Sequence, residues 1–255
     1  MHRSDHSRLG TEPAPPRAGT AEVTIPVGQV SLEGTLVVPG NATGIVVFVH
    51  GSGSSRFSPR NRFVAEVLRT GGIGTLLTDL LTPQEERIDA LTRQFRFNLD
   101  LLTERTVTIL DWLVATDSIG ERPMGLFGSS TGAAAALRAA AVRPNLVAAV
   151  VSRGGRTDLA DPFLDRVRAA TLLVVGSRDI PVLRLNRGSL ERLGAARARR
   201  LEVIPGASHL FEESGALERV AALARDWFTQ HLASTVETTL RAAGPEGRPF
   251  PRDRA

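Results

Sequence analysis

The chain has 255 residues, a formal net charge of +4, 42% apolar and 23% charged residues, and no cysteine. This composition is sufficient for one globular domain with a sizeable core, and it excludes disulfides, thiolate metal sites and a cysteine nucleophile. All basic side chains are arginines spread through the chain without an aromatic platform, so we expect no nucleic-acid partner.

The first 20 residues carry charge and proline, but no apolar stretch of the length that a secretory signal needs. The most hydrophobic later stretch, 132–151, is interrupted by arginine and proline and does not indicate a membrane span. We therefore expect a cytoplasmic protein with no membrane partner. The predicted organisation is a disordered segment at 1–20, one folded domain at 21–235 and a flexible tail at 236–255.

Two segments near the start, 21–27 and 30–39, alternate apolar and polar residues around a tight connection, which predicts an antiparallel hairpin. Later segments are short, nearly continuous apolar runs ending in turn residues, as strands buried on both faces do. These predicted strands are 44–50, 72–80, 124–128, 146–152 and 170–176, with a final strand at 200–206.

Helical patterns separate the strands. They are predicted at about 58–70, 97–117, 130–143 and 213–231. Alternation of strands and helices predicts the α/β class, with a mostly parallel sheet and helices on both faces. Because such sheets bind ligands outside the carboxyl ends of their strands, we expect functional residues directly after the apolar runs.

The segment 128–132, Gly-Ser-Ser-Thr-Gly, matches the pattern GxSxG between a predicted strand and a predicted helix. Ser130 is the central residue. A serine there occupies a strained turn, and the flanking glycines let strand and helix approach without clashes between Cβ atoms. The alternative is a small-residue turn with no catalytic task, since so short a pattern also occurs by chance.

A serine hydroxyl needs a base to become a nucleophile. Among the five histidines, His209 lies directly between the final predicted strand and the final helix, whereas His50 is expected to shape the turn after an earlier strand. Asp179 follows the strand at 170–176, although a lone Asp in a loop is usually a turn or cap residue. Ser130, Asp179 and His209 together stand at strand ends in the chain order Ser, Asp, His, which predicts a catalytic triad.

A tetrahedral intermediate also needs preorganised hydrogen-bond donors. The backbone N–H of Thr131 is one candidate, and the loop at 50–55 offers Ser52 as the first choice for a second donor and Gly53 as the alternative. A glycine-rich loop of this kind can instead hold phosphate. The loop lacks the GK[ST] ending of a P-loop and does not match GxGxxG.

The stretches 50–61, 125–137, 174–186 and 205–213 together resemble the dienelactone-hydrolase-like branch of the α/β-hydrolase superfamily, over residues 21–232. The resemblance implies an α/β-hydrolase fold with an eight-stranded, mostly parallel sheet, the triad Ser130, Asp179 and His209, and no metal or organic cofactor. Dienelactone hydrolase itself uses a cysteine nucleophile, which this chain lacks, so lactone specificity is not carried over.

Relatives often insert a lid between the strands predicted here at 146–152 and 170–176, where this chain has fewer than twenty residues. We therefore expect no large cap domain. Partial cover of the site is expected from 81–97, a polar connection longer than most in a compact domain.

These features favour a cofactor-free carboxylic ester hydrolase that acts on a small-molecule ester. An acyltransferase, a hydrolase of another bond and a catalytically silent binding protein of the same fold are the alternatives. Whether the protein is a monomer or a homodimer stays open.

Arg153 and Arg156 follow the predicted strand at 146–152, next to two glycines. Guanidinium groups there can bind a carboxylate or phosphate of the substrate. The favoured alternative is that Arg153 pairs with Asp158, Asp161 or another acid, or that both arginines face solvent. The arginine-rich segment 195–200 is predicted to be a solvated helix face.

Overall fold

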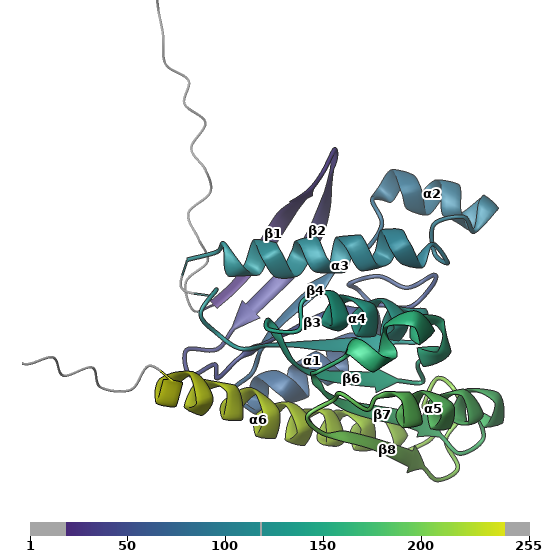
Figure 1. Cartoon of the computed structure of the whole chain (residues 1–255). Helices are drawn as coiled ribbons and strands as arrows, with labels where there is room; N and C mark the ends of the chain where they lie inside the picture. Colours follow the sequence, from purple (N-terminus) through teal and green to yellow (C-terminus); the bar gives the residue numbers. More distant parts are fainter. Residues whose placement is uncertain (1–18, 118, 243–255) are drawn as a thin grey trace, which may run out of the picture.

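The computed structural model describes residues 19–117 and 119–242, which build one eight-stranded sheet with helices on both sides (Figure 1). The hairpin pairing and its pairing to the next strand are antiparallel, and all remaining pairings are parallel. The mostly parallel α/β sheet is therefore confirmed. From edge to edge the strands are β1 (Gly19–Val27), β2 (Val30–Val38), β4 (Gly74–Thr78), β3 (Ile45–Val49), β5 (Met124–Ser129), β6 (Val147–Arg153), β7 (Ala170–Gly176) and β8 (Arg199–Ile204).

The helices include the four predicted ones and two that the sequence patterns missed. The six α-helices are α1 (Pro59–Thr70), α2 (Pro83–Thr92), α3 (Leu99–Val114), α4 (Thr131–Val142), α5 (Ile180–Arg192) and α6 (Ala216–Ala242), and a 3₁₀ segment, η1, spans Thr157–Arg166. Helices α2 and α5 carry weak apolar periodicity. Asp89 is the buried residue of α2, and half of the buried face of α5 is polar, because it consists of Val182, Leu183, Asn186 and Ser189.

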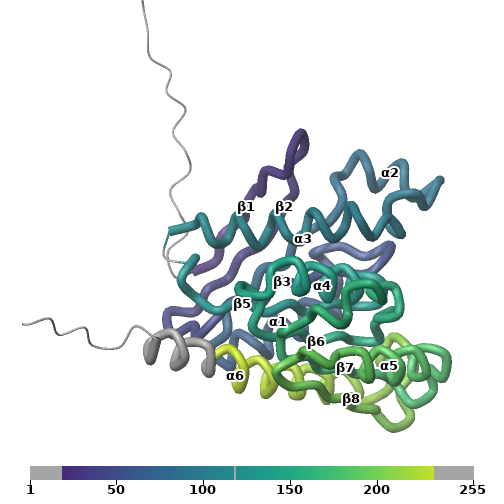
Figure 2. The backbone as a smooth tube through the Cα atoms, viewed as in Figure 1, coloured from purple at the N-terminus to yellow at the C-terminus, as the bar shows by residue number. Residues whose placement is uncertain are grey.

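The central strands are uniformly apolar because both faces of the sheet are covered. Helices α3 and α4 cover one face, and α1 and α6 cover the other (Figure 2). In β3, Ile45, Val47 and Val49 pack on the side of α3 and α4, whereas Val46 and Phe48 pack on the side of α1 and α6. Alternate residues of a strand point to opposite faces, so a strand enclosed in this way needs an apolar residue at every position.

The arginine-rich segment 195–200 is not a helix face, so that prediction is wrong. Helix α5 ends at Arg192, and the segment forms the following loop and the start of the edge strand β8. Arg199 Nη1 donates at 3.1 Å to the carbonyl oxygens of both Leu190 and Glu191, which are free acceptors at the end of α5.

Both chain ends lie largely outside the described residues. Of the segment 1–20 that was predicted to be disordered, residues 1–18 are not described, and residues 19 and 20 begin β1. Helix α6 continues to Ala242, beyond its predicted end at 231 and into the predicted tail, and residues 243–255 are not described. Within the described ranges, no helix combines the length and apolar character needed to cross a bilayer.

Helix α2 is attached to the domain by ion pairing and capping. Thr82 and Glu85 form a capping box, in which the Glu85 side chain accepts from the Thr82 N–H and the Thr82 hydroxyl accepts from the Glu85 N–H. The Glu85 carboxylate also accepts two hydrogen bonds of 2.7 Å from Arg105 of α3. The guanidinium of Arg105 is buried and donates in addition to the Leu80 carbonyl at 2.6 Å. The hydrogen bonds from Arg105 hold the pKa of Glu85 below its ordinary value.

We expect Glu85→Gln to lower the free energy of unfolding by about 2 kcal/mol at pH 7, because a buried arginine loses its counter-charge while the Glu85 side is partly exposed. A carboxyl whose pKa is lower in the folded protein stabilises it above the unfolded pKa and stops doing so as the pH falls. The difference between wild type and variant should therefore be complete above pH 5 and shrink below the ordinary Glu pKa of 4.5. Urea unfolding at several pH values measures it, and a pH-independent difference would contradict the ion-pair origin.

Candidate active site

The turn between β5 and α4 places Ser130 in a conformation that few side chains adopt. Its backbone has φ 51° and ψ −122°. A Cβ at Gly128 would lie 2.4 Å from the Ala133 Cα, and one at Gly132 would lie 2.2 Å from the Val49 carbonyl oxygen. The two glycines of the GxSxG pattern are therefore required by close backbone approach on either side of the serine, as the sequence predicts.

Hydrogen bonds from the neighbouring strand hold this turn. The Ser130 N–H donates to the Arg153 carbonyl at 3.2 Å, and the Ser130 carbonyl accepts from the Arg156 N–H at 3.0 Å. The last residue of β6 and the loop after it thus fix the N–H and the carbonyl of Ser130. The left-handed backbone costs on the order of 1–3 kcal/mol and persists because these contacts determine it.

His209 and Asp179 are directly bonded. The His209 Nδ1 and the Asp179 Oδ2 are 2.6 Å apart, and the Asp179 side chain is 11% exposed. Asp179 is the residue before α5, yet its carboxylate does not cap that helix. The carboxylate bonds the His209 imidazole instead, and the role of Asp179 in catalysis stays a prediction.

Two neighbours position the His209 ring. Gly154, with φ 54°, lies under the ring, because a Cβ there would be 3.4 Å from the His209 Nδ1 and Cε1. Glu213 accepts two hydrogen bonds, of 3.1 and 3.0 Å, from the N–H of Ser208. Those bonds from the backbone, together with a hydrogen bond from the Arg178 side chain, lower the pKa of Glu213 to about 2. The loop that carries His209 is thus tied to an ionised carboxylate.

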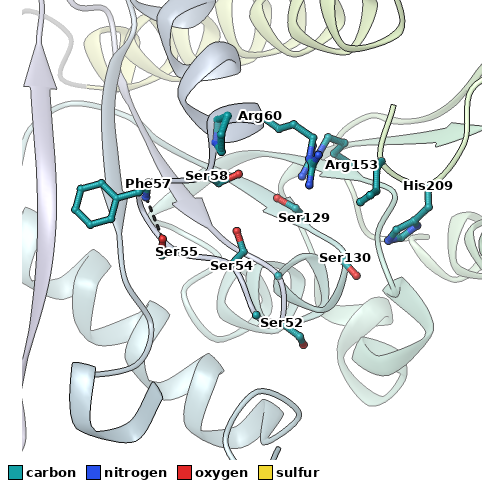
Figure 3. A pocket seen from close by; sticks show the side chains of 14 residues that line it. Ser52, Ser54, Ser55, Phe57, Ser58, Arg60, Ser129, Ser130, Arg153 and His209 are labelled. Atoms are coloured by element: carbon teal, nitrogen blue, oxygen red, sulfur yellow. Dashed lines mark hydrogen bonds between the residues drawn. The ribbon is translucent and has the colours of Figure 1, made fainter. Parts of the chain in front are cut away.

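Ser130 and His209 line one cavity of about 550 Å³ (Figure 3). In Figure 3 the imidazole lies beside the Ser130 hydroxyl on one side of this cavity. The Ser130 hydroxyl donates to no residue in the described part of the chain. A hydrogen bond between nucleophile and base often tightens only when substrate binds, so the open arrangement is compatible with a triad.

The loop after β3 is fixed to two other loops by side-chain bonds. His50 is buried, and its Nε2 accepts from the Leu80 N–H at 3.0 Å while its Nδ1 lies 2.9 Å from the Gly51 carbonyl oxygen. Burial lowers the pKa of His50, so the ring is neutral, with Nδ1 as the donor. The expectation that His50 shapes this turn agrees with these bonds.

Ser52, the first choice for the second oxyanion donor, is engaged in this structure. Its N–H donates to the Thr131 Oγ1 at 3.0 Å, and its hydroxyl donates to the Arg96 carbonyl at 3.1 Å. The Gly53 N–H, the alternative, donates to no residue among those described, and neither does the N–H of Thr131. The arrangement thus favours Gly53 over Ser52, because a buried donor that is already bonded is less available to an oxyanion.

The segment 81–97 supports this loop instead of covering the cavity. Arg96 is held by Asp89, which accepts from the N–H groups of Phe95 at 2.7 Å and Arg96 at 3.0 Å. Burial alone would raise the pKa of Asp89, but these hydrogen bonds keep it below the ordinary value. No residue of 81–97 lines the cavity of Ser130, so partial cover from this segment is absent here.

Arg153 lines the same cavity and is 9% exposed. The acids proposed as its partners bind other arginines: Asp158 pairs with Arg156 through bonds of 2.9 and 2.8 Å, and Asp161 pairs with Arg192. The favoured alternative for Arg153 is therefore wrong, because Arg153 is neither paired with these acids nor solvated. Arg156, which the alternative expected to face solvent, is half-buried and takes Asp158 as its partner.

Two residues of the cavity region escaped the sequence analysis. Arg60, on the first turn of α1, lines the cavity, and Asn61 is buried and accepts at 3.2 Å from the Ser129 hydroxyl. The bond gives Ser129, the other serine of the turn, a partner away from His209. A buried Asn two residues after a helix start carries no sequence signal, since Asn is ordinary near helix caps.

No protein-family model matches the chain. The solved structure of a dienelactone hydrolase from Anabaena variabilis is 55% identical, covers 84% of this chain and 98% of that chain, and superposes with a TM-score of 0.81. The chain belongs to the dienelactone-hydrolase-like family of α/β-hydrolases. An esterase from Pyrococcus furiosus, at 17% identity and a TM-score of 0.68 over 86% of this chain and 98% of that chain, has the same fold.

Two Mycobacterium tuberculosis proteins, from strains CDC 1551 and H37Rv, carry the name "Putative phosphoribosyl transferase". Each is 51% identical over 219 residues, which make up 86% of this chain and 48% of the relative. The α/β-hydrolase chain thus spans about half the length of these curated relatives.

In its described residues, no cluster of three or more His, Asp or Glu side chains is arranged to hold a metal ion.

The close contact behind the turn predicts a large stability difference between two glycine substitutions. Gly132→Ala should lower the free energy of unfolding by about 3 kcal/mol or more, because its Cβ would meet the rigid carbonyls of Val49 and His50. Gly188→Ala is the control: a Cβ there, within α5, meets nothing within 4 Å and should stabilise the protein by about 0.5–1 kcal/mol. Denaturant unfolding of both variants measures the difference, and a Gly132→Ala protein as stable as wild type would contradict this account of the turn.

Proposed function

We propose that the protein is a carboxylic ester hydrolase in which Ser130 is the nucleophile, His209 the base and Asp179 the group that orients the imidazole. The observation that carries this proposal is the 2.6 Å bond between Asp179 and His209, whose side chain lines the same cavity as Ser130, a serine held at positive φ. Family membership supports a hydrolase, and the residues themselves support acyl transfer to serine.

The reaction proceeds in two halves. The Ser130 Oγ attacks the ester carbonyl carbon while His209 Nε2 accepts the hydroxyl proton, and Asp179 stabilises the imidazolium through Nδ1. The tetrahedral intermediate expels the alcohol, which takes the proton back from His209, and leaves an acyl-Ser130. Water then attacks the acyl carbon with His209 again as base, which releases the carboxylic acid and restores the serine.

Negative charge on the carbonyl oxygen needs donors at the start of α4. The N–H of Thr131 lies there, next to the nucleophile and at the positive end of the helix dipole. Gly53 supplies the second N–H, since the N–H of Ser52 is bonded to Thr131 Oγ1. Ser52 takes that role only if substrate binding breaks this bond.

The name of the Mycobacterium tuberculosis relatives does not change this proposal. Those proteins are about twice as long as the matching region, and phosphoribosyl transfer is an activity of whole chains that this chain matches over 48% of their length. The name of these relatives gives no reason to expect a nucleophilic serine, whereas the residues of this chain do.

Ser130→Ala should lower the turnover of p-nitrophenyl esters on the order of 10⁴-fold, because the nucleophile is removed from a unit that acts together. Ser129→Ala is the matched control: it removes the neighbouring hydroxyl and its bond to Asn61, and it should have a much milder effect. Rates for short-chain and long-chain esters, together with labelling by a fluorophosphonate probe, make the comparison.

Three outcomes would contradict this function. Unlabelled Ser130 in folded protein would indicate a catalytically silent protein. Preferential transfer of the acyl group to an added alcohol over water would indicate an acyltransferase. A loss of activity with a chelator that a divalent metal restores would exclude the cofactor-free mechanism, which predicts no effect of chelation.

A further inference from the structure

The buried Arg153 guanidinium has no anionic partner among the described residues. Its Nε and Nη1 are inaccessible to solvent, and no residue of the described ranges accepts a hydrogen bond from its guanidinium. A buried charge without a partner is strongly unfavourable, so proteins normally provide an acid for it. Here the nearby acids are engaged with Arg156 and Arg192.

A second arginine reinforces the positive charge. The guanidinium groups of Arg60 and Arg153 approach each other over Ser129 in Figure 3. Arg60 is half-buried and has a single long contact of 3.3 Å with the exposed Glu212. Burial, together with the charge of Arg60, lowers the pKa of Arg153 to about 10, so Arg153 stays protonated at neutral pH.

Several serine hydroxyls line the cavity between these arginines and the nucleophile, together with the apolar side chains of Phe57, Pro59 and Leu210. Among the described residues, no Asp or Glu lines the cavity. The hydroxyls of Ser54 and Ser58 face its interior in Figure 3, and the positive end of α1 begins beside them at Pro59. Arg153 is also held in place, since the loop after it is fixed by the Asn186 side chain, which donates to the Gly155 carbonyl at 2.8 Å.

We propose that the cavity beside Ser130 binds a phosphate group of the ester substrate, with Arg153 as its principal ligand and Arg60 as the second cation. This inference rests on the proposed function, because it specifies the class of ester that Ser130 attacks. The substrate is then an ester that carries a phosphate monoester or an equivalent dianionic oxyanion elsewhere in the molecule.

A dianion fits these groups better than a carboxylate does. No acid among the described residues lines the cavity, which leaves Arg153 without a counter-charge, and the long contact of Arg60 with Glu212 leaves that second cation only weakly compensated. A dianion can interact with both guanidinium groups, whereas a carboxylate supplies one negative charge. The cavity offers hydrogen-bond donors from two guanidinium groups and two hydroxyls. A carboxylate has two oxygens, which accept hydrogen bonds in a single plane, whereas the three terminal oxygens of a phosphate accept them from several directions.

The first test compares matched p-nitrophenyl esters at pH 8.5 and constant ionic strength. The acyl groups are 4-phosphonobutanoyl, which is dianionic, glutaryl, which carries one carboxylate, and neutral pentanoyl. Matched butanoate esters of 2-phosphonoethanol and propanol place the same charge on the alcohol side. In wild type, kcat/KM for at least one phosphonate ester should exceed that of its neutral analogue more than tenfold.

The variants assign this preference to the arginines. Arg153→Gln should reduce the ratio of kcat/KM between phosphonate and neutral ester about tenfold or more, and Arg60→Gln should reduce it less. Arg153→Lys should retain part of it, because it keeps the charge and loses the bidentate fork. Arg62→Gln is the control, since Arg62 lies on the same helix, is exposed and lines another cavity.

Calorimetric titration with inorganic phosphate gives a second readout that needs no catalysis. Wild type and Arg62→Gln should bind phosphate, and Arg153→Gln should bind it at least tenfold more weakly. If no ester is turned over while this pattern of binding is found, the proposed function fails and the phosphate site stands.

Two results would overturn the proposal itself. One is equal or better use of the neutral esters by wild type at both placements of the phosphonate. The other is a preference for the glutaryl ester as large as that for the phosphonate esters, which would identify a site for a single negative charge. Thermal unfolding of each variant establishes that it is folded before these rates are compared.

Discussion

The absence of a Cβ at Gly128 and Gly132, two residues before and after Ser130, is the constraint on which the candidate site depends. The positive φ of the serine raises its hydroxyl above the end of β5, and the helix that follows must pass so near the strands that Gly128 and Gly132 touch backbone atoms directly. This packing sets the position of α4 against β3 and β5 at the same time. The serine, the first N–H groups of α4 and the loop after β3 therefore form one rigid unit, which is how preorganised donors and a nucleophile are kept in register.

Other elements brace that unit from distant parts of the chain. His50 links the loop after β3 to the loop after β4, and Ser52 links it to Arg96, which Asp89 holds in turn. On the opposite side, Asn186 of α5 fixes the loop after β6. The two helices with weak apolar periodicity, α2 and α5, thus support the site. Each supplies polar side chains that fix a loop at the site to the rest of the domain. These positions are polar because they form hydrogen bonds to the loops, which explains the weak apolar periodicity of both helices.

The distribution of charge around the cavity is the basis of the proposed preference for a phosphate-bearing ester. Among the described residues, the other buried arginine, Arg105, pairs with Glu85. The exception beside the nucleophile is informative because burial makes an uncompensated charge costly, and a protein keeps such a charge where a ligand compensates it. Arg153 is paired with Ser129 in the sheet, so the proposed phosphate ligand is carried by the strand next to the one that leads into the Ser130 turn.

The sequence by itself determined the class of fold, the order in which the strands follow one another along the chain, and the positions of Ser130, Asp179 and His209 after strand ends. These features follow from periodicity, glycine spacing and turn residues, which are local properties of the chain. The sequence did not determine hydrogen-bond partners. The N–H of Ser52 donates to Thr131, and Arg153 pairs with no acid in the part of the chain that the structure describes. Contacts of this kind join segments far apart in the sequence and depend on how the sheet packs them. With 31 basic and 27 acidic residues, many pairings are chemically equivalent in sequence, and only the tertiary structure decides which of them the geometry allows.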